Sequence, residues 1–304
     1  MTATQLLVQV LVLGSAYALV ALGFVLVLNA TGAVNFAQGD LVMAGGFAAT
    51  LLGQALHVSG LVLLPLLMLA MGGLGAAIAV LAYLPLRRRP PEAVFISTIA
   101  VGIILQQTAN RVFGAEPAAA PSLLGAGRVR FAGVDASLQS LAIIAVATLL
   151  MAALHFVFTR TQFGRRLRAT AQDRDMAQAI GIPVDAMVIG TFAIGAALAG
   201  AAGLLLANVY FVEPTSGSDY IVKAYIAVVI GGWGSIVGAV IGALLIAACE
   251  IVYPSLPLLL PGLDRLPAAV FSQPSATVML DAAVLLILLV RPRGLFGEAV
   301  GQRP

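Results

Sequence analysis

The sequence predicts an all-α protein, a polytopic transmembrane helical bundle of about eight spans with glycine-broken helices. Of its 304 residues, 61% are hydrophobic and 10% are charged, and the mean hydropathy is +1.05. A soluble domain is usually about 45–50% apolar and about 25% charged. Between Met1 and Leu86 the one charged side chain is Asp40. This part of the chain must therefore be almost wholly embedded in lipid.

A helix needs roughly 20 mostly apolar residues to cross a hydrocarbon layer of about 30 Å. Apolar runs of this kind, separated by Gly, Pro or charge clusters, fall near 5–29, 36–56, 61–86, 92–113, 138–158, 186–207, 221–253 and 276–290. We expect the whole chain, 1–304, to form a single transmembrane domain. The run 221–253 is long and contains Gly231, Gly232 and Gly234, so it is either two short spans or one bent, partly re-entrant element. The count is eight or nine.

Basic residues are concentrated in three short stretches, at 87–89, 160–174 and 291–303. Such stretches usually face the cytoplasm, and this topology accounts for a sequence pI near 9.4 without a nucleic-acid partner. An even number of crossings must separate the second stretch from the third, which favours two crossings within 221–253. The amino terminus is then outside, unless 36–56 is re-entrant.

Prolines crowd the segment 254–275, which we therefore expect to be an irregular cap on the outer face. They are Pro254, Pro257, Pro261, Pro267 and Pro274, and proline interrupts a regular helix. By the same reasoning Glu250 lies near a helix end. Asp281, at the start of the last apolar run, is expected at the membrane interface.

Two polar, glycine-rich interruptions lie about 200 residues apart and are candidates for a translocation pathway. Such backbone survives at membrane depth where it is buried in protein or lines water, and paired interruptions in the two halves of a chain are typical of transport sites. The residues are Asn35, Gln38, Gly39 and Asp40, then Gly231, Gly232, Trp233, Gly234 and Ser235. Surface turns or small-residue faces for helix packing are the alternative. Gln106, Gln107 and Asn110 cover one side of a helix, which suits either interhelical hydrogen bonds or a pore wall.

The segment 164–183 is the one sizeable polar stretch assigned to the cytoplasmic side. Ala169, Met176 and Ile180 can share a helical face, and Gly181 and Pro183 supply a stop and a turn. We expect a short helix across the inner surface, which either docks on a partner protein or is held by anionic membrane lipid.

Taken in order along the chain, five motifs resemble those of the branched-chain amino acid ABC transporter permeases. They are Gly-Ser-Ala-Tyr-Ala-Leu at 14–19, Asn-Phe-Ala-Gln-Gly-Asp at 35–40, Arg-Arg-Leu-Arg-Ala-Thr-Ala-Gln-Asp at 165–173, Gly-Gly-Trp-Gly-Ser at 231–235 and Arg-Pro-Arg-Gly-Leu-Phe-Gly at 291–297. The resemblance implies a multi-pass protein of the bacterial cell inner membrane. It also implies a second related permease subunit, two cytoplasmic ATPase subunits and a periplasmic amino-acid-binding protein as partners.

In this family the segment 160–185 would be the cytoplasmic coupling segment that docks on an ATPase. The coupling residues are then Arg165, Arg168, Ala169, Asp173, Met176, Ala177, Ile180 and Gly181. Gln38 stands where many members have histidine, and Trp233 stands where a smaller or aliphatic residue is expected. Both departures lie near the proposed pathway, so urea or short amides stay open as solutes beside branched-chain or other hydrophobic amino acids.

The sequence argues against an enzyme. Zinc-protease and nucleophile-elbow motifs are lacking, and two histidines are too few for a metal centre. The one lysine, Lys223, lacks the glycine frame and following hydroxyl of a P-loop, so ATP must be bound by partner subunits and no cofactor is expected here. A stand-alone secondary transporter, with Asp40 as its buried titratable group, is the alternative, although the polar segment 164–183 has no evident task in such a carrier.

Overall fold

The computed structural model describes residues 3–125, 127–131, 134–260, 267–291 and 294–296. The long helices are α1 (Ala3–Thr31), α2 (Gln38–Leu56), α3 (Gly60–Ile78), α4 (Pro91–Phe113), α5 (Leu138–Arg160), α8 (Val184–Val209), α9 (Ser216–Gly231), α10 (Ile236–Leu259) and α11 (Gln273–Val290). The shorter elements are η1 (Ala79–Tyr83), η2 (Leu84–Leu86), α6 (Gln162–Gln172), α7 (Arg174–Ala179) and η4 (Ala268–Phe271). One antiparallel hairpin pairs β1 (Arg128–Phe131) with β2 (Val134–Ser137).

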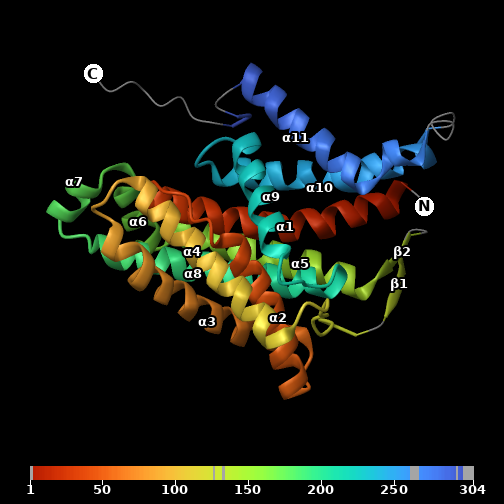
Figure 1. Cartoon of the computed structure of the whole chain (residues 1–304), viewed down its shortest axis with the longest axis horizontal. Coiled ribbons are helices and arrows are strands. Elements are labelled where there is room, and N and C mark those ends of the chain that lie inside the picture. Colours follow the sequence, from red (N-terminus) through yellow and green to blue (C-terminus); the bar gives the residue numbers. More distant parts are fainter. Residues whose placement is uncertain (1–2, 126, 132–133, 261–266, 292–293, 297–304) are drawn as a thin grey trace.

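Eight helices of the described chain are long and apolar enough to cross a membrane, which confirms the predicted class and number of spans. The run 221–253 is broken, as predicted, between Gly231 and Ile236. The first of the two pieces, α9, has 16 residues and is therefore about 24 Å long, shorter than the hydrocarbon layer. In Figure 1 it runs obliquely across α1.

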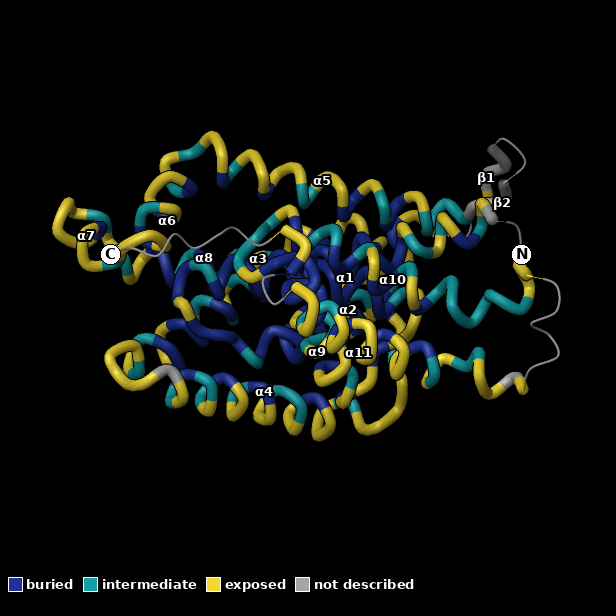
Figure 2. Tube along the Cα trace, turned by 90° about the horizontal axis from the view of Figure 1, so that it is seen from above, coloured by how far each residue is buried: buried dark blue, intermediate teal, exposed yellow. Residues whose placement is uncertain are grey.

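Helices α1 and α8 form the centre of the bundle. Of the most apolar 18-residue stretch of each helix, 89% is buried in α1 and 72% in α8, but 22% in α4 and 11% in α11. Figure 2 shows this contrast as buried central helices with exposed outer faces on α4 and α5. The contacts of α8 with α1, α2 and α3 are close because small residues meet there: a Cβ atom at Gly23 would overlap Gly195 of α8, and one at Gly45 would overlap Gly200. Small residues allow helices to approach in this way in lipid.

The amino terminus and the β hairpin lie at one end of the bundle, and α6 and α7 lie at the other (Figure 1). We call the latter the basic end. Arg87 forms an ion pair with Asp185 in the first turn of α8, so the stretch 87–89 lies at the basic end beside the stretch 160–174. By the positive-inside rule we expect this end to face the cytoplasm and the amino terminus to lie outside.

The expectation of an irregular segment at 254–275 was wrong for 254–259 and 273–275, which are helical, while 261–266 lie outside the described residues. Helix α10 continues through Pro254 and Pro257 to Leu259. Each proline removes one backbone donor, but Leu260 N still donates to Leu256 O at 3.0 Å and Ser255 Oγ to Ile251 O at 2.8 Å. Glu250 therefore lies well inside a helix and not near its end.

The interfacial position expected for Asp281 was also wrong. Helix α11 begins at Gln273, with Pro274 in its first turn, where a missing N–H costs nothing because those donors have no helical acceptor. Asp281 is consequently in the middle of α11, and its side chain is exposed on the outside of this chain.

Candidate functional site

The segment that contains Asn35 and Gln38 is buried in the centre of the bundle. After α1 ends, the chain turns at Gly32 (φ +67°) and re-enters as α2. Gln38 is fully buried and donates from Nε2 to the carbonyl of Gly195 in α8 at 3.1 Å, next to Gly23 of α1. This predicted pathway residue thus lies between the two most buried helices.

Asp40 joins α2 to α4 and α9. Its Oδ1 atom accepts a hydrogen bond from Gln106 Nε2 of α4 at 2.8 Å. A Cβ atom at Gly217 of α9 or at Gly102 of α4 would overlap its carboxylate. The neighbouring Gly39 lies directly against the Gly217 carbonyl. Gln106 therefore forms an interhelical hydrogen bond, the first of the two roles considered for it.

Two buried polar atoms of this segment have no hydrogen-bond partner within the described part of the chain. They are Asn35 Nδ2 and Gln38 Oε1. Leaving a buried donor or acceptor unpaired costs about 1–3 kcal/mol, so each of these amides keeps unused hydrogen-bonding capacity inside the bundle. Their role in a pathway stays a prediction.

The segment 231–235 forms a tight turn near the C-terminal end of α1. Gly232 (φ +113°) and Gly234 (φ +83°) have left-handed backbone, and Ser235 Oγ accepts from Gly238 N at 3.0 Å to cap α10. Asn29 of α1 donates to the carbonyl of Gly234 at 2.9 Å. Trp233 is 52% exposed and packs edge-on against Tyr225 at 6.0 Å.

The structure does not bring the two predicted pathway segments into one site. Gly39 contacts the N-terminal end of α9, at Gly217 and Ile221, whereas Gly231 and Gly232 end the same helix. The two segments are instead linked through α9. The pathway role of both segments stays a prediction.

The C-terminal motif has a structural role that the sequence did not reveal. Leu295 N donates to the carbonyl of Ile230 at 2.8 Å, and Phe296 N donates to Gly231 at 2.9 Å. These are among the last carbonyls of α9, for which the helix itself provides no N–H donor. Gly294 (φ +74°) lies against Val229 and Gly232, so 294–296 cap the end of the broken helix.

The predicted coupling segment consists of two short helices and not one. Helix α6 ends at Gln172, and Asp173, in extended conformation, caps α7 by accepting from Met176 N at 2.9 Å. Of the predicted coupling residues, Arg165, Arg168, Asp173, Met176, Ile180 and Gly181 are exposed and Ala169 is half-buried. Ala177 is 1% exposed, so it packs inside the protein and does not form part of the outer surface.

Helix α7 is tied to the bundle through Arg174. This guanidinium donates to Tyr83 Oη at 3.1 Å and to the carbonyl of Ala30, at the end of α1, at 2.5 Å. Two apolar side chains next to it, Met176 and Ile180, are 61% and 67% exposed. The basic end therefore presents an exposed apolar pair on a helix that is connected to the central helix of the bundle.

Helix α4 presents a polar face to the outside of the chain. Gln107, Thr108, Asn110 and Arg111 are exposed and line an open groove. Groups of this kind are unfavourable against lipid tails. Together with Asp281 on α11, they mark surfaces that need a protein or water neighbour.

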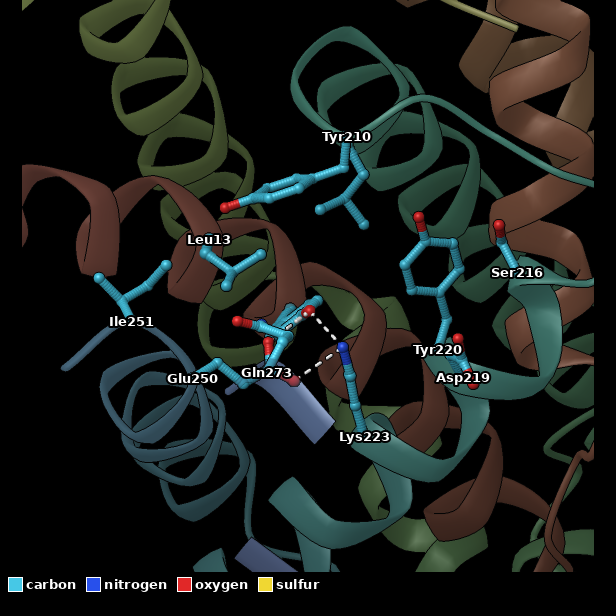
Figure 3. A pocket seen from close by; sticks show the side chains of 11 residues that line it. Leu13, Tyr210, Ser216, Asp219, Tyr220, Lys223, Glu250, Ile251 and Gln273 are labelled. Atoms are coloured by element: carbon cyan, nitrogen blue, oxygen red, sulfur yellow. Dashed lines mark hydrogen bonds and ion pairs between the residues drawn. The ribbon is translucent and has the colours of Figure 1, made fainter. Parts of the chain in front are cut away.

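Tyr17, Lys223 and Glu250 form a cluster that the sequence did not predict, because Glu250 was expected near a helix end. Lys223 Nζ lies 2.7 Å from Glu250 Oε1 and donates to Tyr17 Oη at 2.8 Å, and Tyr17 Oη donates to Glu250 Oε2 at 2.9 Å. Figure 3 shows Lys223 directed from α9 towards the Glu250 carboxylate. The available signal was the one lysine of the chain and one carboxylate, each inside an apolar run.

This cluster forms one wall of a cavity of about 390 Å³. Its other residues come from α1, α8, α9, α10, α11 and the segment after α8. They are Leu13, Leu206, Tyr210, Ser216, Asp219, Tyr220, Ile251 and Gln273. Burial, followed by the charge of Glu250, raises the pKa of the Tyr210 hydroxyl, which therefore stays a neutral donor.

In the described residues no three His, Cys, Asp or Glu side chains are grouped in a way that could hold a metal ion.

Comparisons with known proteins identify the family. The family model described as branched-chain amino acid transport system / permease component matches residues 6–289. The high-affinity branched-chain amino acid transport system permease protein BraD of Pseudomonas aeruginosa is 34% identical over 97% of this chain and 95% of its own length. The corresponding protein LivH of Escherichia coli is 34% identical over 94% and 92%. A probable LivH of Methanocaldococcus jannaschii is 31% identical over 76% and 75%. The chain belongs to the permease family of branched-chain amino acid transport systems.

Proposed function

We propose that the chain is the translocation subunit of an ATP-driven importer of branched-chain amino acids in a bacterial inner membrane. Its family membership over residues 6–289 is the observation that carries the proposal. The relatives are named as permeases of high-affinity branched-chain amino acid transport systems. The chain has no P-loop of its own, so the energy must come from a second protein.

The ATPase partner is expected to dock on α6 and α7. Met176 and Ile180 are large exposed apolar side chains at the basic end, and exposed apolar residues rimmed by charge are typical of protein interfaces. Arg165, Arg168 and Asp173 supply that rim. A force on α7 would reach α1 through the hydrogen bonds of Arg174 to Ala30 and Tyr83.

A second permease subunit is the expected neighbour of α4 and α11. The exposed polar side chains Gln107 and Asn110 of α4 and Asp281 of α11 lie in helices of membrane-spanning length. Polar groups in such positions usually face a partner helix or a water-filled cavity. A permease pair would provide both, with the pathway enclosed between or beside the two chains.

In this mechanism ATP binding closes two ATPases, shifts α6 and α7, and changes the access of the pathway from the inner to the outer side. A periplasmic binding protein then releases its amino acid into the open cavity. The short helix α9 is the element suited to move, because glycines lie at both of its ends and it contacts α1, α2 and α10. Broken helices of this kind commonly form the binding sites of transporters.

Co-purification from native membranes tests the proposed partners. The tagged chain should capture ATPase subunits, identified by mass spectrometry, and a Met176→Glu/Ile180→Glu variant should lose at least about 90% of them, because two charges would be buried in an apolar contact. Gln178→Glu, an exposed residue of the same helix, is the matched control and should behave as wild type. A folded wild-type chain that captures no ATPase would contradict the proposal and favour a stand-alone carrier.

A further inference from the structure

The cluster of Tyr17, Lys223 and Glu250 places two opposite charges at the middle of the bundle. Tyr17 is the central residue of α1, and the Glu250 side chain is 3% exposed. Burying charges costs several kcal/mol per ion, and a buried pair is often no more stabilising than apolar residues of the same size. An ionisable group inside a membrane protein is therefore a sign of function. Joining α1, α9 and α10 would not by itself require charge.

The ammonium group of Lys223 has one donor to spare. An ammonium carries three N–H donors, and within the described chain two acceptors are provided for them, Glu250 Oε1 and Tyr17 Oη. The Lys223 side chain is 23% exposed and lines the cavity of about 390 Å³. The spare donor is thus available to an anionic group inside that cavity.

Acidic and hydroxyl groups lie on the same face of α9, one turn before Lys223. Residues four apart in a helix lie on one face, which places Asp219 next to Lys223. Figure 3 shows Asp219 and Tyr220 on the α9 side of the cavity and Glu250 across from them. The cavity is therefore dipolar, with one cation, Lys223, and two carboxylates, Asp219 and Glu250.

Three of the residues that line the cavity are aliphatic. Leu13 of α1, Leu206 of α8 and Ile251 of α10 face the same space. The volume of about 390 Å³ is at the lower end of the range of about 300–1,000 Å³ that small-molecule sites occupy. An aliphatic amino acid has a carboxylate, an ammonium group and a small apolar side chain. The cavity offers a complementary group for each: a cation, carboxylates and aliphatic side chains.

We propose that this cavity is a transit binding site for the zwitterion of an aliphatic α-amino acid, bound through its carboxylate by Lys223. The ammonium group of the amino acid faces Asp219 and Glu250, and its side chain contacts Leu13, Leu206 and Ile251. The inference rests on the proposed function for the class of solute. Two other classes of ligand fit less well. A carboxylic acid without an ammonium group would be repelled by Asp219 and Glu250, and an uncharged amide would offer no anion to the spare donor of Lys223.

Binding at this site should be weak and reversible. Lys223 is already neutralised by Glu250, so the ligand adds a charge-assisted hydrogen bond and does not rescue an unpaired cation. A transport pathway needs this property, because a tightly held solute would leave slowly.

The test is equilibrium binding of tritiated L-leucine to the purified full chain in lipid nanodiscs, titrated up to the solubility of leucine. Unlabelled leucine should compete, whereas leucinamide, which lacks the carboxylate, and 4-methylpentanoate, which lacks the ammonium group, should compete at least about tenfold less well, the effect of losing one charge-assisted contact. The Lys223→Met/Glu250→Gln variant removes both charges and leaves no buried ion unpaired. It should keep the melting temperature and elution profile of a folded chain and bind leucine at least about tenfold more weakly.

Two further variants separate recognition from structure. Asp219→Asn should weaken leucine binding and improve the relative affinity for 4-methylpentanoate, a change that a merely structural residue would not produce. Arg87→Met/Asp185→Asn neutralises an ion pair at the basic end, far along the bundle, and should bind leucine like wild type.

Unchanged leucine binding by the folded Lys223→Met/Glu250→Gln variant would overturn the proposal. So would equal competition by the three ligands, or the absence of saturable binding to folded wild-type chain. None of these results would contradict the proposed function, because capture of the ATPase at α6 and α7 is a separate measurement on residues that do not line the cavity. Failure of the wild-type chain to capture an ATPase, together with intact leucine binding, would contradict the proposed function and leave the binding site supported.

Discussion

At the scale of single residues, glycine determines how closely the helices approach. Gly39 of α2 lies on the Gly217 carbonyl and the Ile221 backbone of α9, whereas Gly73 of α3 has open space where its Cβ would be. Both are helical glycines. They therefore form a matched pair in which only the neighbours differ.

We predict opposite effects of alanine at these two positions. Gly73→Ala should leave stability unchanged or raise it by about 0.5–1 kcal/mol, because alanine is the better helix former. Gly39→Ala should lower it by at least about 1–3 kcal/mol, the usual cost of overpacking. Thermal unfolding in detergent, followed by circular dichroism, measures both. Equal melting temperatures would show that α2 and α9 do not touch as described.

The ion pair of Lys223 and Glu250 gives a second prediction at this scale. Lys223→Met alone leaves the Glu250 carboxylate buried without a counter-ion, and should destabilise the chain by about 3–5 kcal/mol. Lys223→Met/Glu250→Gln should cost much less than the sum of the single variants, because coupled partners are not additive. Additive losses of melting temperature across the four proteins of this cycle would contradict the contact.

At the scale of helices, the C-terminal segment 294–296 stabilises the end of α9. Gly294 requires positive φ and lies against the Val229 carbonyl. Gly294→Ala should increase amide hydrogen exchange at the end of α9 by about tenfold, from the loss of the Leu295 and Phe296 hydrogen bonds at about 1 kcal/mol or more. Gly114→Ala is the control, since Gly114 has the same backbone requirement (φ +76°) with nothing near its Cβ. Equal exchange in α9 of both variants would argue against the cap.

The break between α6 and α7 gives a further prediction. Asp173 caps α7 through Met176 N, so Asp173→Ala should weaken the start of α7 by about 1 kcal/mol. Hydrogen exchange should rise in 174–180 and ATPase capture should fall, with the melting temperature of the bundle unchanged. Asp175→Ala, an exposed acidic residue of the same turn, should have the smaller effect. The reverse order would show that the cap does not position the helix.

At the scale of helices, some features could be predicted from the sequence and others could not. Spans and the break at 231–235 were predictable because hydropathy and glycine act locally. The extent of α10 was not, since Pro254 and Pro257 are tolerated where the neighbouring hydrogen bonds survive. The position of Glu250 beside Lys223 was hidden by that error, and the pairing joins residues 27 positions apart through tertiary packing. The hydrogen bonds of 294–296 to α9 likewise depend on the assembled fold.

At the scale of the whole molecule, two polar regions are connected by the central helices. At the basic end, Arg174 of α7 hydrogen-bonds to Ala30 of α1 and to Tyr83 of η1. The cavity at Lys223 is formed by α1, α8, α9, α10 and α11. Helix α1 belongs to both regions and is the most buried span. We therefore expect docking of a partner at the basic end to act on the cavity through α1.

The central claim is that the chain is the translocation subunit of an ATP-driven importer, and ATP-driven uptake of leucine into proteoliposomes tests it most directly. The chain is reconstituted with the subunits that co-purify with it and with its binding protein. We predict accumulation that requires ATP, is retained by Gln178→Glu and is lost in Met176→Glu/Ile180→Glu while the complex's chain stays folded. Leucine entry that is independent of ATP, and equal in the two variants, would contradict the account.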